Sequence, residues 1–177
     1  MIEKKIHYIW FGEEKTEKVK KCIESWYKYL PDYEIIEWNE TNIDIEEEKK
    51  KNKFFKLCYE KGLWGFLTDY LRTKILYQNG GIYFDTDIEV LKSFNNLLEN
   101  DFFLGKQSET SISPIPAMRI PKHNFLKKML AIYDKEIWKI NKYVSTEIIE
   151  MILKRDYQIQ ERLIEENIKI YSKEYFY

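Results

Sequence analysis

Two aspartates, Asp85 and Asp87, lie one residue apart after the apolar run Ile82–Phe84 and the glycines Gly80 and Gly81. Side chains alternate between the two faces of a strand, so an extended backbone would point both carboxylates the same way. Like charges so close repel each other, and a divalent cation that prefers oxygen ligands, Mg²⁺ or Mn²⁺, relieves the repulsion. Because one or two carboxylates leave coordination positions free, the cation could also hold a diphosphate and neutralise the charge on a departing nucleoside diphosphate.

The same pair has two other interpretations. Asp-x-Asp occurs often by chance, and a polar strand end that enters a turn needs no ligand. Phosphatases that resemble haloacid dehalogenases also place Asp-x-Asp at a strand end, with the first aspartate as nucleophile and the second as acid and base. Their pattern usually lies near the N-terminus and carries Thr or Val two residues after the second aspartate, where this chain has Glu89. Open α/β sheets bind ligands at the carboxyl ends of strands, and this context favours a binding site for a phosphate-bearing substrate.

Asp69 and Arg72 precede the glycines on a predicted helix, where their i, i+3 spacing places them on one face. They form either an ordinary ion pair or part of a site in which Asp69 accepts from sugar hydroxyls and Arg72 counters a substrate's negative charge. Tyr8 and Trp10, near the end of a predicted first strand, are either core residues or a surface on which a nucleotide base stacks. His7 has no second histidine nearby and is interpreted as a packed core residue.

The hydrophobic pattern predicts strands and helices that would position these residues. Strands are predicted at Lys5–Phe11, Tyr33–Asn39, Ile82–Val90, Asp101–Gly105 and Ile168–Tyr177, with Ser111–Ile120, which contains Pro114 and Pro116, as an edge strand or loop. Helices are predicted at Val19–Leu30, at Phe54–Gln78 with a break near Gly62 and Gly65, at Pro121–Trp138 and at Val144–Leu153. The charged run Ile45–Lys53 is typical of a solvated helix face or loop. The first forty residues therefore follow a β-α-β order, which normally builds a parallel sheet.

Length and composition limit the architecture and the class of partner. A chain of 177 residues, 44% of them hydrophobic, is large enough for one domain with a substantial core. The 29 basic and 30 acidic residues give a net charge of -1, which lacks the positive field of nucleic-acid binders. Cys22 and Cys58 lie far apart and predict neither a disulfide framework nor a zinc site. Without a signal peptide or membrane span in the sequence, we expect a cytoplasmic protein, or one that associates peripherally with the inner face of a membrane.

Three segments together resemble the DXD-containing glycosyltransferases of family 32, which include bacterial capsular and surface polysaccharide transferases and yeast initiating α-mannosyltransferases. The segments are IHYIWFG, CIESWYKYLPDYEIIEWNE and FLTDYLRTKILYQNGGIYFDTDIEVL. The resemblance implies an α/β fold of the GT-A type, a Rossmann-like nucleotide-diphospho-sugar transferase fold with a mixed central sheet flanked by helices. It implies one domain over residues 1–177, with a nucleotide-sugar-binding part at 1–105 and an acceptor-side part at 106–177.

The resemblance also assigns roles at the nucleoside and sugar end of a donor. By position, Ile9 and Trp10 would flank the nucleobase of the donor. Thr68, Asp69 and Arg72 would address its ribose, sugar and diphosphate. The donor would be a UDP-sugar or GDP-mannose, and the acceptor a glycan or a lipid-linked saccharide. Transfer would retain the donor's α configuration.

At the phosphate end, the resemblance places Tyr83 against the phosphate or sugar, Asp85 against the ribose or metal, and Asp87 as the direct ligand of Mn²⁺ or Mg²⁺. Together with Asp69 and Arg72, Asp87 would carry the catalysis. Family members generally continue beyond the segment that matches IYSKEYF and place further site residues there. We therefore expect that a chain ending at Tyr177 is either naturally short or lacks a C-terminal segment. A sugar-nucleotide-binding protein that keeps the donor half without turnover is the non-enzyme alternative.

Overall fold

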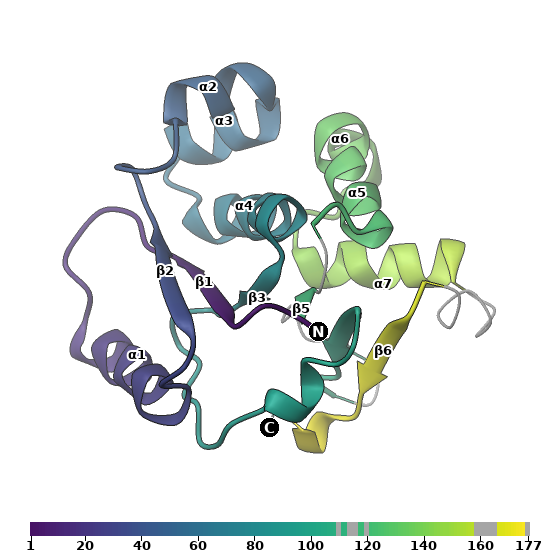
Figure 1. The fold of residues 1–177 in the computed structure, drawn as a ribbon. Coiled ribbons are helices and arrows are strands. Elements are labelled where there is room, and N and C mark those ends of the chain that lie inside the picture. The colour runs from purple at the N-terminus through teal and green to yellow at the C-terminus, as the bar shows by residue number, and fades with distance from the viewer. Residues whose placement is uncertain (109–110, 113–116, 119–120, 158–165, 176–177) are drawn as a thin grey trace.

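A mixed sheet runs through the described part of the molecule in the strand order β2-β1-β3-β5-β4-β6 (Figure 1). The computed structural model describes residues 1–108, 111–112, 117–118, 121–157 and 166–175. The strands are β1 (Lys5–Ile9), β2 (Glu34–Trp38), β3 (Gly81–Tyr83), β4 (Phe102–Gly105), β5 (Ala117–Met118) and β6 (Ile168–Tyr171). The helices are α1 (Glu17–Tyr29), α2 (Ile45–Lys51), α3 (Lys53–Glu60), α4 (Trp64–Asn79), α5 (Asn124–Ala131), α6 (Ile137–Ile140) and α7 (Ser145–Asp156), with a π-helical segment, Ile132–Glu136, between α5 and α6. Short 3₁₀ turns occur at Asn95–Leu97 and Lys173–Tyr175.

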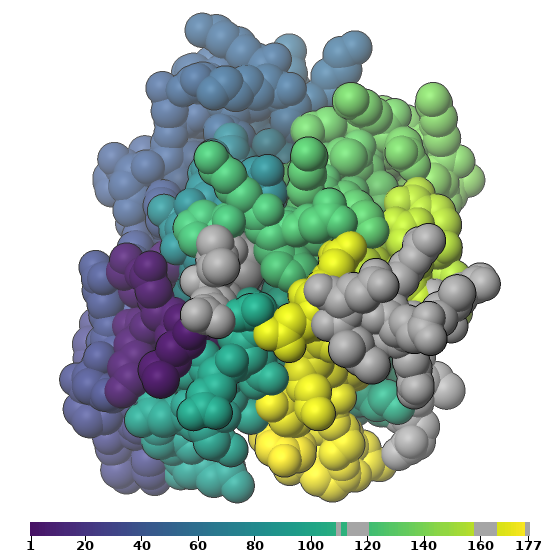
Figure 2. Space-filling model, turned by 45° about the vertical axis from the view of Figure 1, so that its right-hand side comes forward, coloured from purple at the N-terminus to yellow at the C-terminus, as the bar shows by residue number. Residues whose placement is uncertain are grey.

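The β-α-β order predicted for the first forty residues is confirmed. β1 and β2 pair in parallel, from Lys5 opposite Glu34 to Ile9 opposite Trp38, and α1 connects them. The β1 strand also pairs in parallel with β3 on its other side. The expected α/β class with a mixed central sheet flanked by helices is likewise confirmed: β5 is antiparallel to β3 and β4, and β6 is parallel to β4. Figure 2 shows β6, in yellow, beside the teal segment that contains β4.

Two hydrophobic cores form on the two faces of the sheet because successive side chains of a strand point to opposite sides. On one face, Ile6 and Tyr8 of β1 pack with Trp26 of α1. On the other face, Ile9 of β1 and Tyr83 of β3 join the core of α3, α4, α5 and α7. In Figure 1, α1 accordingly lies on one side of the sheet, with α4 and α7 on the other. The buried His7, which we expected in the core, is only 1% exposed.

The helix predicted over Phe54–Gln78 is interrupted, as expected, near Gly62. It consists of α3 and α4, and Gly65 lies inside α4 rather than at the break. The charged run at 45–53 is helical over α2, but it is not wholly solvated: Glu48 is buried and forms an ion pair with Lys74 of α4. The sequence pattern missed this contact because the partner lies 26 residues away.

Three strand predictions were wrong in extent or position. The last of them, Ile168–Tyr177, forms a strand only to Tyr171, before the 3₁₀ turn at Lys173–Tyr175. The strand predicted over Ile82–Val90 ends at Tyr83, and the backbone turns at Thr86 and Asp87. The segment Ser111–Ile120 was predicted as an edge strand or loop, but its described strand β5 pairs with both β3 and β4 and is therefore internal. Pro114 and Pro116, the reason for that prediction, lie outside the described residues.

Cys22 and Cys58 are both buried and free. None of the helices in the described part of the chain combines the length and apolarity that crossing a bilayer requires.

Candidate functional site

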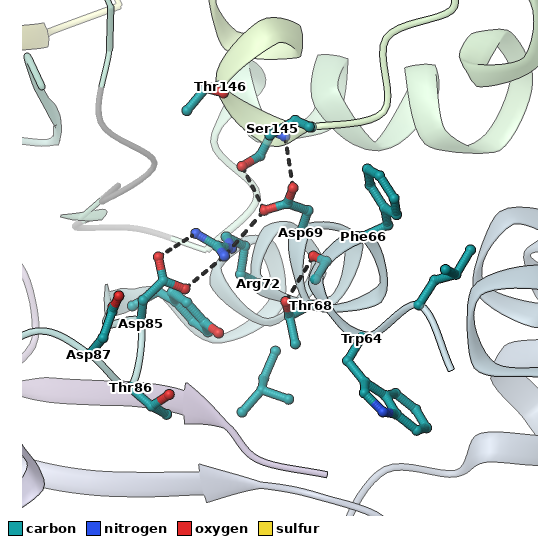
Figure 3. Close-up of a pocket in the computed structure, with 15 residues that line it drawn as sticks. Trp64, Phe66, Thr68, Asp69, Arg72, Asp85, Thr86, Asp87, Ser145 and Thr146 are labelled. Atoms are coloured by element: carbon teal, nitrogen blue, oxygen red, sulfur yellow. Dashed lines mark hydrogen bonds and ion pairs between the residues drawn. The ribbon is translucent and has the colours of Figure 1, made fainter. Parts of the chain in front are cut away.

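The main cavity lies where the carboxyl ends of β1 and β3 meet the amino-terminal ends of α4 and α7 (Figure 3). Its volume is about 710 Å³, within the range of roughly 300–1,000 Å³ that small-molecule sites occupy. The lining residues are Ile9, Leu63, Trp64, Gly65, Phe66, Thr68, Asp69, Arg72, Tyr83, Asp85, Thr86, Asp87, Val144, Ser145 and Thr146. Segments from the beginning, middle and later part of the chain therefore build one site.

Arg72 holds two carboxylates at the base of the cavity. Its Nη1 and Nη2 donate to the two carboxylate oxygens of Asp85 at 3.1 and 2.7 Å, and Nη2 lies 3.2 Å from Oδ1 of Asp69. The guanidinium also lies 4.8 Å from the centre of the Tyr83 ring. Burial alone would lower the pKa of Arg72, but the charges of Asp85 and Asp69 raise it above its ordinary value. Arg72 is therefore a fixed cation that orients Asp85 in a bidentate pair.

Asp69, Asp85 and Asp87 form an acidic cluster in which negative charge exceeds positive charge. Arg72 is the one cationic side chain among the described residues that line the cavity. Burial raises the pKa of the Asp85 carboxyl; the charge of Arg72 works in the opposite direction, while Asp69 and Asp87 raise this pKa further. An additional cation beside Asp85 and Asp87 would offset this excess charge.

The acidic cluster fits a hard divalent cation that takes its remaining ligands from substrate phosphates and water. In the described part of the chain, no group of three His, Cys, Asp or Glu side chains could by itself hold a metal ion. Mg²⁺ is commonly bound through one or two carboxylates, with substrate phosphates and water as its other ligands. Asp87 is exposed and Asp85 is half-buried at the same cavity, and these two carboxylates match that donor set.

The two aspartates of the Asp-x-Asp pair reach the cavity by a different route from the predicted one. Because β3 ends at Tyr83, strand alternation does not orient them. Instead the chain turns, with the amide of Ile88 donating to the carbonyl of Asp85 at 3.1 Å. The turn brings Thr86 to the cavity as well, whereas an extended strand would have pointed it to the opposite face.

Asp69 lines the cavity but its carboxylate is mostly engaged within the protein. Oδ2 accepts from the backbone amide of Ser145 at 3.0 Å, and Oδ1 accepts from the Ser145 hydroxyl at 2.7 Å. The i, i+3 spacing correctly placed Asp69 and Arg72 on one helix face, where they form an ion pair. The contact with Ser145, 76 residues further along the chain, was not predicted.

The other residues expected in the site are placed as follows. Ile9, Thr68 and Tyr83 line the main cavity, and the Thr68 hydroxyl donates to the carbonyl of Gly65 at 2.9 Å. Trp10 lies instead at a neighbouring hollow, and its indole N–H donates to the carbonyl of Glu13 at 2.6 Å. Ile9 and Trp10, expected to flank one nucleobase, thus line two adjacent hollows at the end of β1.

Sequence reasoning missed two segments of the lining, Leu63–Phe66 and Val144–Thr146. Both are the starts of helices, where backbone N–H groups lack partners within the helix. Leu63, Trp64 and Val144 are exposed and give the cavity an apolar rim. The sequence does carry a signal for the second segment, because Ser145 and Thr146 followed by Glu147 and an apolar run are typical of a helix start.

Comparison with known families and proteins gives an independent view of this site. A family described as "Glycosyltransferase sugar-binding region containing DXD motif" matches residues 16–104, half of the chain. The match covers the acidic cluster and Arg72 and ends before α7.

Two individual proteins are similar to this chain. "Subversion of eukaryotic traffic protein A" of Legionella pneumophila is 32% identical over 110 residues, which cover 49% of this chain and 17% of that protein. The chain therefore spans only a small part of the length of this relative. The solved structure of "PaToxG Glycosyltransferase" superposes with a TM-score of 0.68 at 16% identity, covering 93% of this chain and 72% of that one. At this identity, the structural similarity concerns the fold.

Proposed function

The chain belongs to the family of glycosyltransferase sugar-binding regions that contain a DXD motif, and we propose that its main cavity binds a nucleotide-diphosphate sugar with Mn²⁺ or Mg²⁺. The sugar, from a UDP-sugar or GDP-mannose, is transferred to an acceptor with retention of the α configuration. The acceptor is a glycan, a polysaccharide or a lipid-linked saccharide. The single observation that carries the proposal is the acidic cluster held around Arg72 at the carboxyl end of β3.

Different side chains of the cavity bind different parts of the donor and its cation. Asp87, which is exposed at the cavity, is the proposed direct ligand of the cation, and Asp85, which lines the same cavity, is the proposed second ligand. When bound, the cation neutralises charge that develops on the leaving nucleoside diphosphate. Arg72 keeps Asp85 in a fixed orientation. Arg72 therefore contributes to binding of the diphosphate indirectly, by setting the geometry of the acidic cluster.

Asp69 is the proposed contact to hydroxyls of the donor sugar. Thr68 on the same helix turn and the backbone at the start of α4 complete this side of the site. Ile9 and Tyr83 form the apolar floor beneath the donor, and Trp10 in the adjacent hollow provides an aromatic face for the base. None of these side chains needs to act as a nucleophile if the acceptor attacks on the same face from which the nucleoside diphosphate leaves.

Turnover of a donor panel tests the proposal. UDP-sugars and GDP-mannose are incubated with the protein and Mn²⁺, and release of the nucleoside diphosphate is measured with and without saccharide acceptors. We expect one donor to be consumed by the wild-type protein, and consumption to be lost in Asp87→Asn. Donor binding without turnover on any acceptor would support the binding protein instead. Release of inorganic phosphate from simple phosphoesters would support a phosphatase.

A second candidate acceptor, a protein of a eukaryotic cell, is favoured by the name of the Legionella relative, which refers to subversion of eukaryotic traffic. The apolar rim formed by Leu63, Trp64 and Val144 would suit contact with a protein surface. Transfer of a radiolabelled sugar separates the two candidates. Label in saccharide fractions would favour the first acceptor. Label that stays in protein bands after glycosidase has digested the free glycans would favour the second.

A further inference from the structure

Ser145, at the first position of α7, contacts the carboxylate of Asp69 with two different donors. Its backbone amide donates to Oδ2 at 3.0 Å and its hydroxyl donates to Oδ1 at 2.7 Å (Figure 3). Ser145 is 1% exposed and Asp69 is 6% exposed, so the contact is shielded from bulk water. A charge-assisted pair in such surroundings is stronger than one at the surface.

These contacts leave the Asp69 carboxylate with little freedom. A carboxylate offers about four lone-pair positions, two on each oxygen. Oδ1 faces both the Ser145 hydroxyl and Nη2 of Arg72, whereas Oδ2 accepts one hydrogen bond among the described residues, from the Ser145 amide. One acceptor position on Oδ2 therefore remains for a ligand in the cavity that Asp69 lines.

The position of Ser145 is set by an element outside the part of the chain that matches the family. The helix α7 packs against α4, which carries Asp69 and Arg72. Because Ser145 begins α7, its amide belongs to the positive end of the helix and favours a negatively charged partner. The location of α7 thus fixes the rotation of a carboxylate on another helix.

We propose that Ser145 is a positioning residue, which holds Asp69 so that its remaining acceptor position meets a hydroxyl of the donor sugar. This inference rests on the proposed function. It concerns recognition of the sugar rather than of the nucleoside diphosphate, because among the described residues Ser145 hydrogen-bonds to Asp69 and not to Asp85 or Asp87, the proposed cation ligands.

The test compares two variants that each delete one buried hydroxyl bonded to Asp69. Ser145→Ala removes the donor to the carboxylate, whereas Thr73→Val removes the hydroxyl that donates to the backbone carbonyl of Asp69 at 2.9 Å. Affinities for the nucleotide sugar and for the free nucleoside diphosphate are measured by calorimetry with Mn²⁺. We expect Ser145→Ala to weaken binding of the nucleotide sugar about tenfold and to change the affinity for the nucleoside diphosphate by no more than about twofold. Thr73→Val should change neither affinity.

Two further variants keep the result decisive. In an Asp69→Asn background, Ser145→Ala should cause no additional loss of sugar selectivity, since coupled residues are not additive. Ser145→Thr retains the hydroxyl and should keep the wild-type selectivity; equal loss in the Thr and Ala variants would attribute the effect to packing and overturn the inference. If the wild-type protein binds the nucleotide sugar selectively and Ser145→Ala does too, the inference alone fails. If the wild-type protein binds no nucleotide sugar, the proposed function fails with it.

Discussion

Asp87 is the carboxylate of the acidic cluster that is best placed to bind an added cation. It is exposed, and its side chain has no hydrogen-bond partner among the described residues, whereas Asp85 and Asp69 are held by Arg72 and Ser145. Because the Asp87 carboxylate makes no hydrogen bond or ion pair among the described residues, it adds little to the stability of the folded state. Its role can therefore be separated from stability.

Asp87→Asn should abolish Mn²⁺-dependent donor binding without unfolding the protein. The amide keeps the shape of the side chain but loses the charge that a hard cation requires. Glu89→Gln is a matched control, because Glu89 is exposed two residues further on and does not line the cavity. Calorimetry with and without Mn²⁺ measures binding, and thermal unfolding measures stability. Unchanged affinity and metal dependence in Asp87→Asn would show that the metal assignment is wrong.

At the residue scale, spacing predicted what lies close in the chain and missed what folding brings together. The i, i+3 spacing of Asp69 and Arg72 anticipated their contact, since neighbouring turns of a helix fix that geometry. The bidentate pairing of Arg72 with Asp85 joins a helix to the segment after a strand, and it depends on where the chain turns after Tyr83. Ser145 had no local signal for a contact with Asp69, because that contact depends on how α7 packs on α4.

The connection between α4 and β3 sets the distance between Arg72 and Asp85 and depends on Gly81. Gly81 has a φ of 78°, and a Cβ there would lie 2.9 Å from the carbonyl oxygen of Lys5 and 3.0 Å from Nε2 of His7. Both neighbours belong to β1, which pairs with β3. The glycine therefore permits a close approach of strand to strand as well as a left-handed backbone.

Gly81→Ala should destabilise the fold by about 2–5 kcal/mol, because backbone strain and a steric clash with β1 add together. Gly12→Ala is the control: Gly12 has a φ of 83°, but a Cβ at this position would meet no other atom within 4 Å. Gly12→Ala should lower the free energy of unfolding only through the strain of its left-handed backbone, by about 1–2 kcal/mol. Urea unfolding of both variants gives the two values. Equal losses would mean that the contact with β1 has no energetic consequence.

The buried His7 on β1 should make stability depend on pH. Burial lowers the pKa of His7 to about 4, although the carbonyl of Gly80 works in the opposite direction. The unfolded chain, with an ordinary pKa near 6.5, then binds more protons than the folded chain between these values. The contribution is fully present above pH 6.5 and is lost as the pH falls to about 4, by about 3 kcal/mol in all.

Comparison of the wild-type protein with His7→Gln checks this pH dependence. Free energies of unfolding are measured from pH 7 to pH 4, and carboxylates contribute equally to both proteins, so the difference isolates His7. We expect the stability of His7→Gln to fall less steeply over this range. Parallel curves would mean that His7 is protonated as readily in the folded state as in the unfolded chain.

At the element scale, the sequence predicted regular elements better than their ends. The β-α-β start was correct because alternating burial and helical spacing are strong local patterns. The strand after Gly81 was predicted too long, since apolar residues recur at Ile88 and Val90 while pairing with β1 stops near His7 and Tyr83. A strand requires a partner as well as a suitable sequence, and the register of the partner is not readable from one segment.

For the whole molecule, the cavity joins parts of the chain that are far apart in sequence. Three parts of the chain line it: the end of β1, the first turns of α4 together with the turn after β3, and the start of α7, which lies beyond the segment that matches the family. A ligand that contacts all three parts holds them together in the folded state. Because a ligand that binds only the folded state raises its stability, binding should be visible as resistance to heat.

A nucleotide sugar with Mn²⁺ should therefore raise the unfolding temperature, and chelation should remove most of the increase. At a donor concentration about 100 times Kd the gain is about 2.7 kcal/mol, which corresponds to roughly 5–11 °C for a domain of this size. Mn²⁺ alone should have a smaller effect, because two carboxylates supply few ligands without the diphosphate. Thermal unfolding is compared with four additions to the protein: the donor alone, Mn²⁺ alone, the donor with Mn²⁺, and the donor with Mn²⁺ and EDTA. A full increase with EDTA present would mean that the donor binds without the cation, and the role of Asp85 and Asp87 would then be to contact the donor directly.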